Sequence, residues 1–141
     1  MADRPRVFIE DHFPTAELGI ESVRERAAAS ALPPIYFLHV WWARRPLVAS
    51  AGAILGSLLP VWSQDLADAF SQRPELATAD AYRTWFLQLC GILGDPVLGR
   101  KKIDEAKATG EKLKDNGYGY KQAYKNSPPP EQVELLHEVL E

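Results

Sequence analysis

The sequence has little of the chemistry that builds disulfide frameworks or metal sites. Cysteine occurs once, at Cys90, so the chain cannot form an internal disulfide. The three histidines are scattered and show no spacing typical of zinc ligands: His12, His39 and His137. These absences favour a cytoplasmic protein without a structural metal.

A long hydrophobic run is also missing. The first residues, MADRPRVFIEDHF, carry charges where a secretory signal needs an uninterrupted apolar stretch. The longest apolar stretch, from Leu47 to Trp62, is broken by two serines and a proline and is shorter than the roughly 18 residues of a membrane span. We therefore expect a soluble protein that does not contact a membrane.

The chain as a whole has no net positive charge, but basic residues are concentrated in one segment. The formal net charge is -3, which argues against a protein that holds nucleic acid by bulk charge alone. Between Arg100 and Lys125, however, the sequence contains eight basic residues and only four acidic ones. Any phosphate binding must therefore be local.

The 141 residues, 46% of them hydrophobic, are enough for one domain with a core, which we place at 1–141. Helical patterns begin near Glu17, Pro46, Gln64, Thr78, Pro96 and Pro130. The segment Ile35 to Trp42, IYFLHVWW, favours a buried strand, and Val7 to Ile9 is its best available partner. The predicted fold class is mainly α with a minor β component (α+β), with about five helices around one or two short strands.

Two helical stripes are candidates for the core. The first contains Leu47, Ala51, Ile54, Leu55 and Leu58, and the second contains Tyr82, Trp85, Phe86, Leu89 and Leu93. Gly52 and Gly56, four residues apart, indicate either close helix packing or mere tolerance of glycine at these positions.

The most unusual stretch is HVWWARRPLVAS, from His39 to Ser50. Arginine side chains offer planar donor forks to a carboxylate or phosphate, and indoles offer flat faces to an aromatic ring. A helix that starts at Pro46 would add partial positive charge and free N–H groups. The combination suits an anionic ligand with an aromatic part. The alternative is structural: the two tryptophans are buried, and Arg44 and Arg45 pair with acids such as Glu21 or Glu25.

Familiar catalytic patterns are missing. The sequence has no glycine-rich phosphate loop, no Ser/His/Asp set with family spacing, no DPPY-type tetrapeptide and no glycine-rich loop that binds S-adenosylmethionine. Cys90 lies in the second apolar stripe, which indicates a buried, inert thiol.

Several strings together identify a family resemblance. IESVRERAAASALPPIYFLHVWWARRPLVAS, GILGDPV, ATGEKL, NGYGYKQAY and SPPPEQVELLHEVL resemble the N-terminal module of large prokaryotic adenine-specific DNA methylases that contain a zinc ribbon, some of them linked to phage defence. The module was formerly a domain of unknown function. The resemblance implies that the chain is an incomplete part of a larger α/β methyltransferase, truncated before the cofactor-binding loop.

The resemblance also implies site residues. The segment around Arg45 is similar to the HPTQKPL segment of amino-methyltransferases, and this implies an S-adenosylmethionine pocket lined by His39, Trp42, Arg44, Arg45 and Pro46. The cofactor is expected only in the full-length parent, since the chain by itself should be inactive and bind no cofactor. Tyr118, Tyr120 and Lys121 are candidate DNA contacts, although a tyrosine-rich loop packed on the core is an equally open interpretation.

Two functions therefore remain open. The first is a methyltransferase fragment that contributes to the cofactor pocket or to DNA contact. The second is a stand-alone module that binds nucleic acid or docks a protein. A fragment cut from a larger domain should expose apolar surface, so we also expect self-association.

Overall fold

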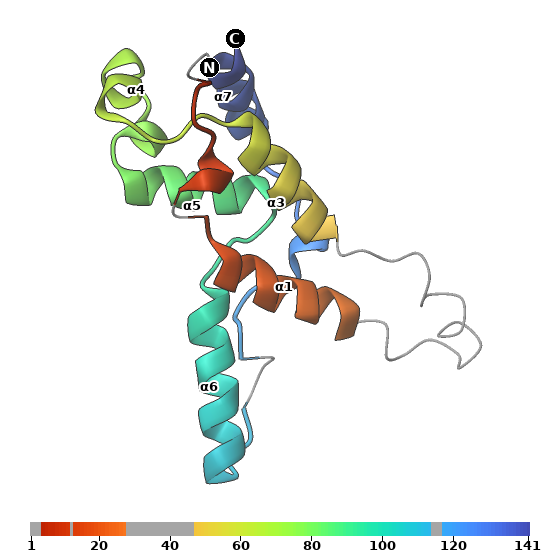
Figure 1. Ribbon diagram of the computed structural model, residues 1–141. Coiled ribbons are helices and arrows are strands. Elements are labelled where there is room, and N and C mark those ends of the chain that lie inside the picture. Colours follow the sequence, from red (N-terminus) through yellow and green to blue (C-terminus); the bar gives the residue numbers. More distant parts are fainter. Residues whose placement is uncertain (1–3, 12, 28–46, 114–116) are drawn as a thin grey trace, which may run out of the picture.

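The computed structural model describes residues 4–11, 13–27, 47–113 and 117–141. Six α-helices lie in these ranges (Figure 1). They are α1 (Thr15–Ala27), α3 (Leu47–Leu58), α4 (Gln64–Ala69), α5 (Ala79–Leu89), α6 (Pro96–Thr109) and α7 (Pro130–Leu140). Three 3-10 helices join them: η1 (Phe8–Glu10), η3 (Pro74–Leu76) and η4 (Ala123–Lys125). The mainly helical prediction is thus confirmed.

The predicted β component is not found in the part of the chain that the structure describes. The strand predicted for Ile35 to Trp42 lies outside the described residues. The strand predicted for Val7 to Ile9 is wrong, because Phe8–Glu10 forms η1 and only Val7 makes an isolated antiparallel bridge, with Pro60. The Glu10 carboxylate accepts the Val7 N–H at 3.0 Å, and this local bond favours the turn over an extended strand.

Side chains cap three of the described helix starts. The side chains of Ser63, Thr78 and Asp95 each accept a backbone N–H three residues ahead, at 2.9 to 3.2 Å. Proline follows Asp95 at the first position of α6, where its missing N–H costs nothing.

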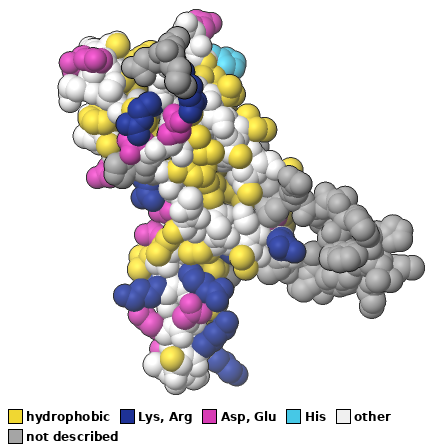
Figure 2. All heavy atoms as spheres, viewed as in Figure 1, with side chains coloured by type: hydrophobic (Ala, Val, Ile, Leu, Met, Phe, Trp, Pro, Cys, Tyr) yellow, Lys and Arg dark blue, Asp and Glu magenta, His cyan; other side chains and the backbone are white. Residues whose placement is uncertain are grey.

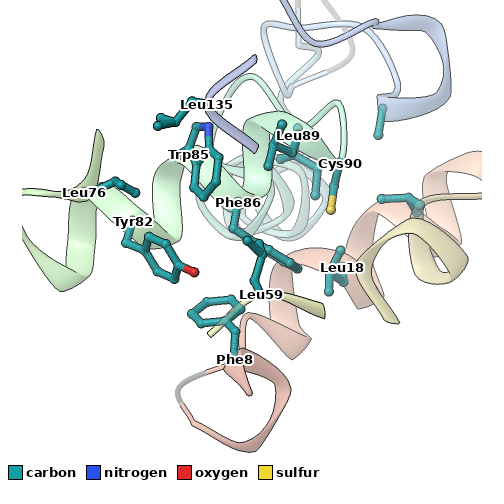
Figure 3. Packing of buried hydrophobic residues seen from close by; sticks show 13 residues of the cluster. Phe8, Leu18, Leu59, Leu76, Tyr82, Trp85, Phe86, Leu89, Cys90 and Leu135 are labelled. Atoms are coloured by element: carbon teal, nitrogen blue, oxygen red, sulfur yellow. The ribbon is translucent and has the colours of Figure 1, made fainter. Parts of the chain in front are cut away.

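The core is built around α5 (Figure 3). Tyr82, Trp85 and Phe86 are almost completely buried. The Phe8 ring lies 4.8 Å from the Phe86 ring and edge-on to Tyr82 at 5.3 Å, so η1 closes one side of the core. Leu135 of α7 is buried in the same cluster. The predicted stripe is therefore core as far as Leu89.

The end of that stripe was predicted incorrectly. Leu93 is exposed, whereas Ile92 is buried. The reason is that α5 ends at Leu89 and the chain turns at Gly91, whose φ is +82°, so helical spacing no longer applies.

The buried face of α3 also differs from the prediction. Leu47, Ile54 and Leu58 are 64%, 60% and 57% exposed, whereas Val48, Gly52 and Gly56 are buried. A Cβ added to Gly52 would lie 2.9 Å from the Leu18 side chain, and one added to Gly56 would lie 2.6 Å from the Phe13 ring. The two glycines therefore allow close helix packing. Leu47, Ile54 and Leu58 are exposed to solvent, whereas Leu55 of the predicted stripe packs against the core.

Candidate nucleic-acid interface

The segment Gly117–Asn126, called the strap below, connects three helices that are distant in sequence. It follows α6, runs back beside it and ends in η4, which contacts both α1 and α3 (Figure 1). The GYGYK motif lies at the start of the strap, so its surroundings decide what these residues can do.

Each tyrosine of the motif packs on a glycine of the GDPVLG segment. Tyr118 packs on Gly99, where an added Cβ would overlap its ring, and Tyr120 packs on Gly94, where an added Cβ would come within 2.5 Å of the ring. The glycines of the motif itself, Gly117 and Gly119, have φ of +77° and +75°, a conformation that other residues rarely adopt. The two motifs are therefore complementary parts of one contact.

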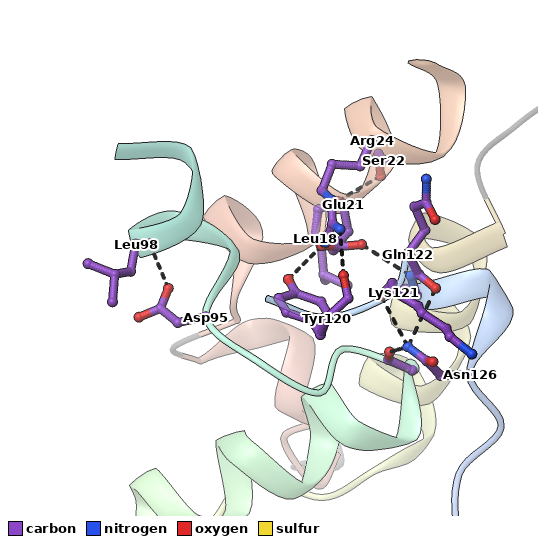
Figure 4. Close-up of polar contacts among 12 residues, drawn as sticks. Leu18, Glu21, Ser22, Arg24, Asp95, Leu98, Tyr120, Lys121, Gln122 and Asn126 are labelled. Atoms are coloured by element: carbon purple, nitrogen blue, oxygen red, sulfur yellow. Dashed lines mark hydrogen bonds and ion pairs between the residues drawn. The ribbon is translucent and has the colours of Figure 1, made fainter. Parts of the chain in front are cut away.

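A buried carboxylate fixes the strap to α1 (Figure 4). Glu21 is 1% exposed, and its Oε1 accepts a 2.6 Å hydrogen bond from the Tyr120 hydroxyl. Its Oε2 accepts the backbone N–H of Ala123 at 3.2 Å. Glu21 also pairs with Arg24, one turn along α1, so this buried charge has a counter-charge and two further donors.

Arg24 completes the attachment. Its Nη2 donates to the Tyr120 carbonyl at 3.0 Å, and its guanidinium carbon lies 3.7 Å from the centroid of the Tyr118 ring. A cation over an aromatic face within about 6 Å is attractive. One face of Tyr118 is therefore occupied by a side chain of the same protein.

The pKa of the Tyr120 hydroxyl is raised well above its ordinary value, first by burial and second by its hydrogen bond to Glu21. Tyr120 therefore stays protonated at neutral pH and remains a donor to the carboxylate. The sequence offered no signal for this pair, because Glu21 and Tyr120 are 99 residues apart.

The far end of the strap has a second anchor. The Asn126 side-chain amide donates to the Gly91 carbonyl at 2.8 Å and to the Lys121 carbonyl at 3.3 Å. A side chain at Gly91 would overlap the backbone of Ala123. The strap is thus bound to α1, α6 and the turn after α5.

Basic side chains, with acidic ones among them, lie on the visible face of the lobe formed by α6, residues 110–113 and the strap (Figure 2). Arg100 pairs with Asp104 at 3.0 Å, and Lys101 lies 3.9 Å from Glu105. Five further lysines are exposed and have no acidic partner within the described ranges: Lys102, Lys107, Lys112, Lys121 and Lys125. The lobe therefore presents positive charge to solvent.

The structure brings some of the predicted site residues together. Tyr118 and Tyr120 are half-buried and Lys121 is exposed, all three on the strap. The predicted cofactor residues His39, Trp42, Arg44, Arg45 and Pro46 lie outside the described residues. Whether any of these residues binds DNA or cofactor remains a prediction.

The start of α3, directly after the predicted cofactor residues, is capped by a carboxylate from α1. Glu25 of α1 accepts the backbone N–H groups of Leu47 and Val48 at 2.9 and 3.3 Å. These amides are thus already engaged and are not the free N–H groups expected from the sequence. Glu21 and Glu25, the acids considered as partners of the arginines, both accept hydrogen bonds from other groups.

Within the described ranges, no three His, Cys, Asp or Glu side chains are arranged to hold a metal ion. A groove of about 630 Å³ is lined by aromatic, apolar and charged residues: Phe8, Asp11, Phe13, Val61, Trp62, Ala79, Asp80 and Arg83. Its Arg83 pairs with Glu17 at 2.7 Å.

None of the described helices is both long and apolar enough to cross a bilayer.

Comparison with known proteins places the chain in a family. Residues 12–85, just over half of the sequence, match the model of a protein family of unknown function, DUF1156. The chain belongs to this family. No curated protein and no solved structure matches it.

Proposed function

We propose that the chain is the N-terminal module of an S-adenosylmethionine-dependent, adenine-specific DNA methyltransferase with a zinc ribbon, of the kind linked to phage defence. In this proposal the module supplies a DNA contact and part of the cofactor pocket, and it has no methyltransferase activity alone. The parent fold would be a larger α/β methyltransferase. The sequence resemblance supports the proposal, and the match to DUF1156 supports only its assignment to a module of unknown function.

The charge distribution along the sequence carries the DNA-binding part. The segment Arg100 to Lys125 has a net charge of +4, from eight basic and four acidic residues, within a chain of net charge -3. The rest of the chain therefore carries -7. Such an asymmetry steers a protein so that its positive lobe meets a polyanion first.

The cofactor part is assigned to residues 39–46. S-adenosylmethionine, when bound to the longer protein, would supply the methyl group. Since Glu25 already engages the first amides of α3, we assign recognition of the cofactor's carboxylate to the Arg45 and Arg44 side chains and not to the helix start. Trp42 and His39 would provide the aromatic wall, with Pro46 at the start of the helix.

The test compares cofactor binding by this chain and by a longer protein that includes the catalytic motifs. Replacing Arg45 by alanine in the longer protein should weaken S-adenosylmethionine binding by roughly 1.5 to 3 kcal/mol, the worth of a hydrogen bond to a charged group. Arg26→Ala, an exposed arginine on α1, is the matched control and should leave binding unchanged. Isothermal titration calorimetry measures both. Tight cofactor binding by this chain alone, or unchanged binding by the Arg45→Ala protein, would contradict the assignment.

A second candidate is a stand-alone module that binds nucleic acid or docks a protein. It is favoured by the strap, whose anchors on Glu21, Arg24 and Gly91 all lie within this chain. Methyl transfer to DNA distinguishes the two functions, because only the methyltransferase predicts that the longer protein transfers a methyl group to adenine.

A further inference from the structure

The positive lobe has two kinds of cation. Arg100 and Lys101 are held by acids on the next turn of α6, whereas Lys102, Lys107 and Lys112 are not paired within the described ranges. All three are exposed, and a lysine side chain carries a compact charge on a flexible stem. The unpaired lysines are therefore the charges of the lobe that a ligand can engage without breaking an existing ion pair.

The aromatic side chains of the lobe are arranged differently. The Tyr118 ring lies between the Arg24 guanidinium and Gly99, and the Tyr120 ring packs on Gly94. Binding of single strands depends on free aromatic faces on which bases stack. Tyr118 and Tyr120 are half-buried in the protein, and Tyr124 is the one exposed tyrosine of the strap, at 41%, with the Lys125 ammonium 5.5 Å from its ring centroid. The exposed chemistry of the lobe is therefore mainly charge, with one ring open to stacking.

The length of α6 fits a dense row of phosphates. Its 14 residues extend over about 21 Å at 1.5 Å per residue. Duplex DNA carries one negative charge per 1.7 Å of axis, so about 12 phosphate charges lie alongside such a helix. Lys102 and Lys107 lie on α6 and Lys112 follows it, so each can meet a phosphate without a particular base sequence.

We infer that the α6 lobe is a sequence-independent binding surface for the phosphate backbone of duplex DNA, and that Lys102, Lys107 and Lys112 make the contacts. Glu21 and Arg24 are positioning residues, because they hold the strap against α1 and α6. The inference deepens the proposed function and depends on it for the choice of DNA as the polyanion.

The experiment titrates this chain into a fluorescein-labelled 20-base-pair DNA duplex of arbitrary sequence, without cofactor, and follows anisotropy at several salt concentrations. For the unmodified chain, affinity should fall as salt increases. In the double variant Lys102→Ala/Lys107→Ala, the slope of log affinity against log salt should become shallower by about 2, because each lost phosphate contact accounts for about 0.9. Circular dichroism should show unchanged folding, since both residues are exposed.

Two controls make the result specific. Arg6→Ala/Arg26→Ala removes the same charge from exposed residues outside the lobe and should leave the slope unchanged. Lys102→Arg/Lys107→Arg keeps the charge and should retain DNA affinity. If the Arg6/Arg26 control changes the salt slope by the same amount, DNA affinity depends on the net charge of the protein and not on the lobe. This result would overturn the inference.

Other ligands are tested in parallel. The inference would also be overturned if the chain binds a 20-base single strand more tightly than the duplex. Tighter binding to vesicles of anionic phosphatidylserine than to DNA, or no DNA binding at 25 mM salt, would overturn it as well. These outcomes are distinguishable from failure of the proposed function. That failure would appear as absent methyl transfer and cofactor binding by the longer protein, whatever the DNA affinity of this chain.

Discussion

The Tyr120 hydroxyl donates a 2.6 Å hydrogen bond to Oε1 of Glu21, a carboxylate that is 1% exposed. The same oxygen pairs with Arg24, whose guanidinium also lies over the rings of Tyr118 and Tyr120. One buried acid therefore links α1 to the segment that follows α6. This arrangement makes the position of the basic lobe depend on a charge network, and its strength can be measured.

Arg24→Met should destabilise the protein by about 3 to 5 kcal/mol, because it leaves the buried Glu21 without its counter-charge. Urea denaturation gives the free energy of unfolding. The double variant Glu21→Gln/Arg24→Met should recover part of the loss, because a neutral amide replaces the unpaired charge. Arg73→Met is the control: Arg73 pairs with Glu138 at the surface, where ion pairs contribute about 1 kcal/mol or less. If Arg24→Met and Arg73→Met lower the free energy of unfolding by similar amounts, burial of the ion pair does not determine its contribution to stability.

Gly99→Ala should destabilise the protein by about 1 to 3 kcal/mol, the usual cost of overpacking, because the new Cβ overlaps the Tyr118 ring. Gly19→Ala provides the comparison: Gly19 lies in α1 with nothing within 4 Å of an added Cβ, and alanine there should stabilise by roughly 0.5 to 1 kcal/mol. Thermal unfolding followed by circular dichroism measures both. Equal effects at the two positions would mean that Tyr118 does not pack as described.

Stability should decrease at alkaline pH. Burial raises the pKa of the Cys90 thiol from 9.0 to about 12 and also raises that of the Tyr82 hydroxyl. The folded state thus retains protons that the unfolded chain releases. The Cys90 contribution is fully present below pH 9 and is lost as the pH rises toward 12, whereas the Tyr82 contribution starts to be lost only above pH 10. Each group loses about 1.4 kcal/mol per pH unit within its window.

Urea titrations at pH 7 to 11 measure this loss. The variant Cys90→Ala should show a smaller loss between pH 9 and pH 10, because the thiol no longer titrates. If the loss in that interval is the same with and without the thiol, Cys90 is not buried in the folded state.

The exposed stripe on α3 predicts self-association. The helix α3 contains no charged residue. Its side chains Leu47, Ile54 and Leu58 are exposed among the described residues, and such apolar surface favours association. Sedimentation velocity should show dimers or larger species as concentration rises, and Ile54→Gln should weaken them. Val97→Gln, which changes an exposed apolar residue on α6, should have no effect. A clean monomer at high concentration would contradict the prediction.

The sequence by itself determined most of the helices. Caps such as Asp95-Pro96 and Thr78, and stripes such as Tyr82 to Leu89, act within one or two turns, so they specify a helix whatever lies around it. The concentration of basic residues after Arg100 was equally visible, because charge is counted without coordinates. The resemblance of the cofactor cluster likewise rests on the sequence alone.

Only the tertiary structure decided which faces meet. The buried face of α3 follows Val48, Gly52 and Gly56 and not Leu47, Ile54 and Leu58, because Leu18 and Phe13 occupy the space that the glycines leave. The strand expected at Val7 to Ile9 became a turn, because a three-residue segment is decided by neighbours such as Leu59, whose carbonyl accepts the Phe8 N–H. The fit of Tyr118 and Tyr120 on Gly99 and Gly94 joins segments about 20 residues or more apart, and Glu21 reaches its partner across 99 residues. Such contacts depend on packing in three dimensions, and no local pattern records them.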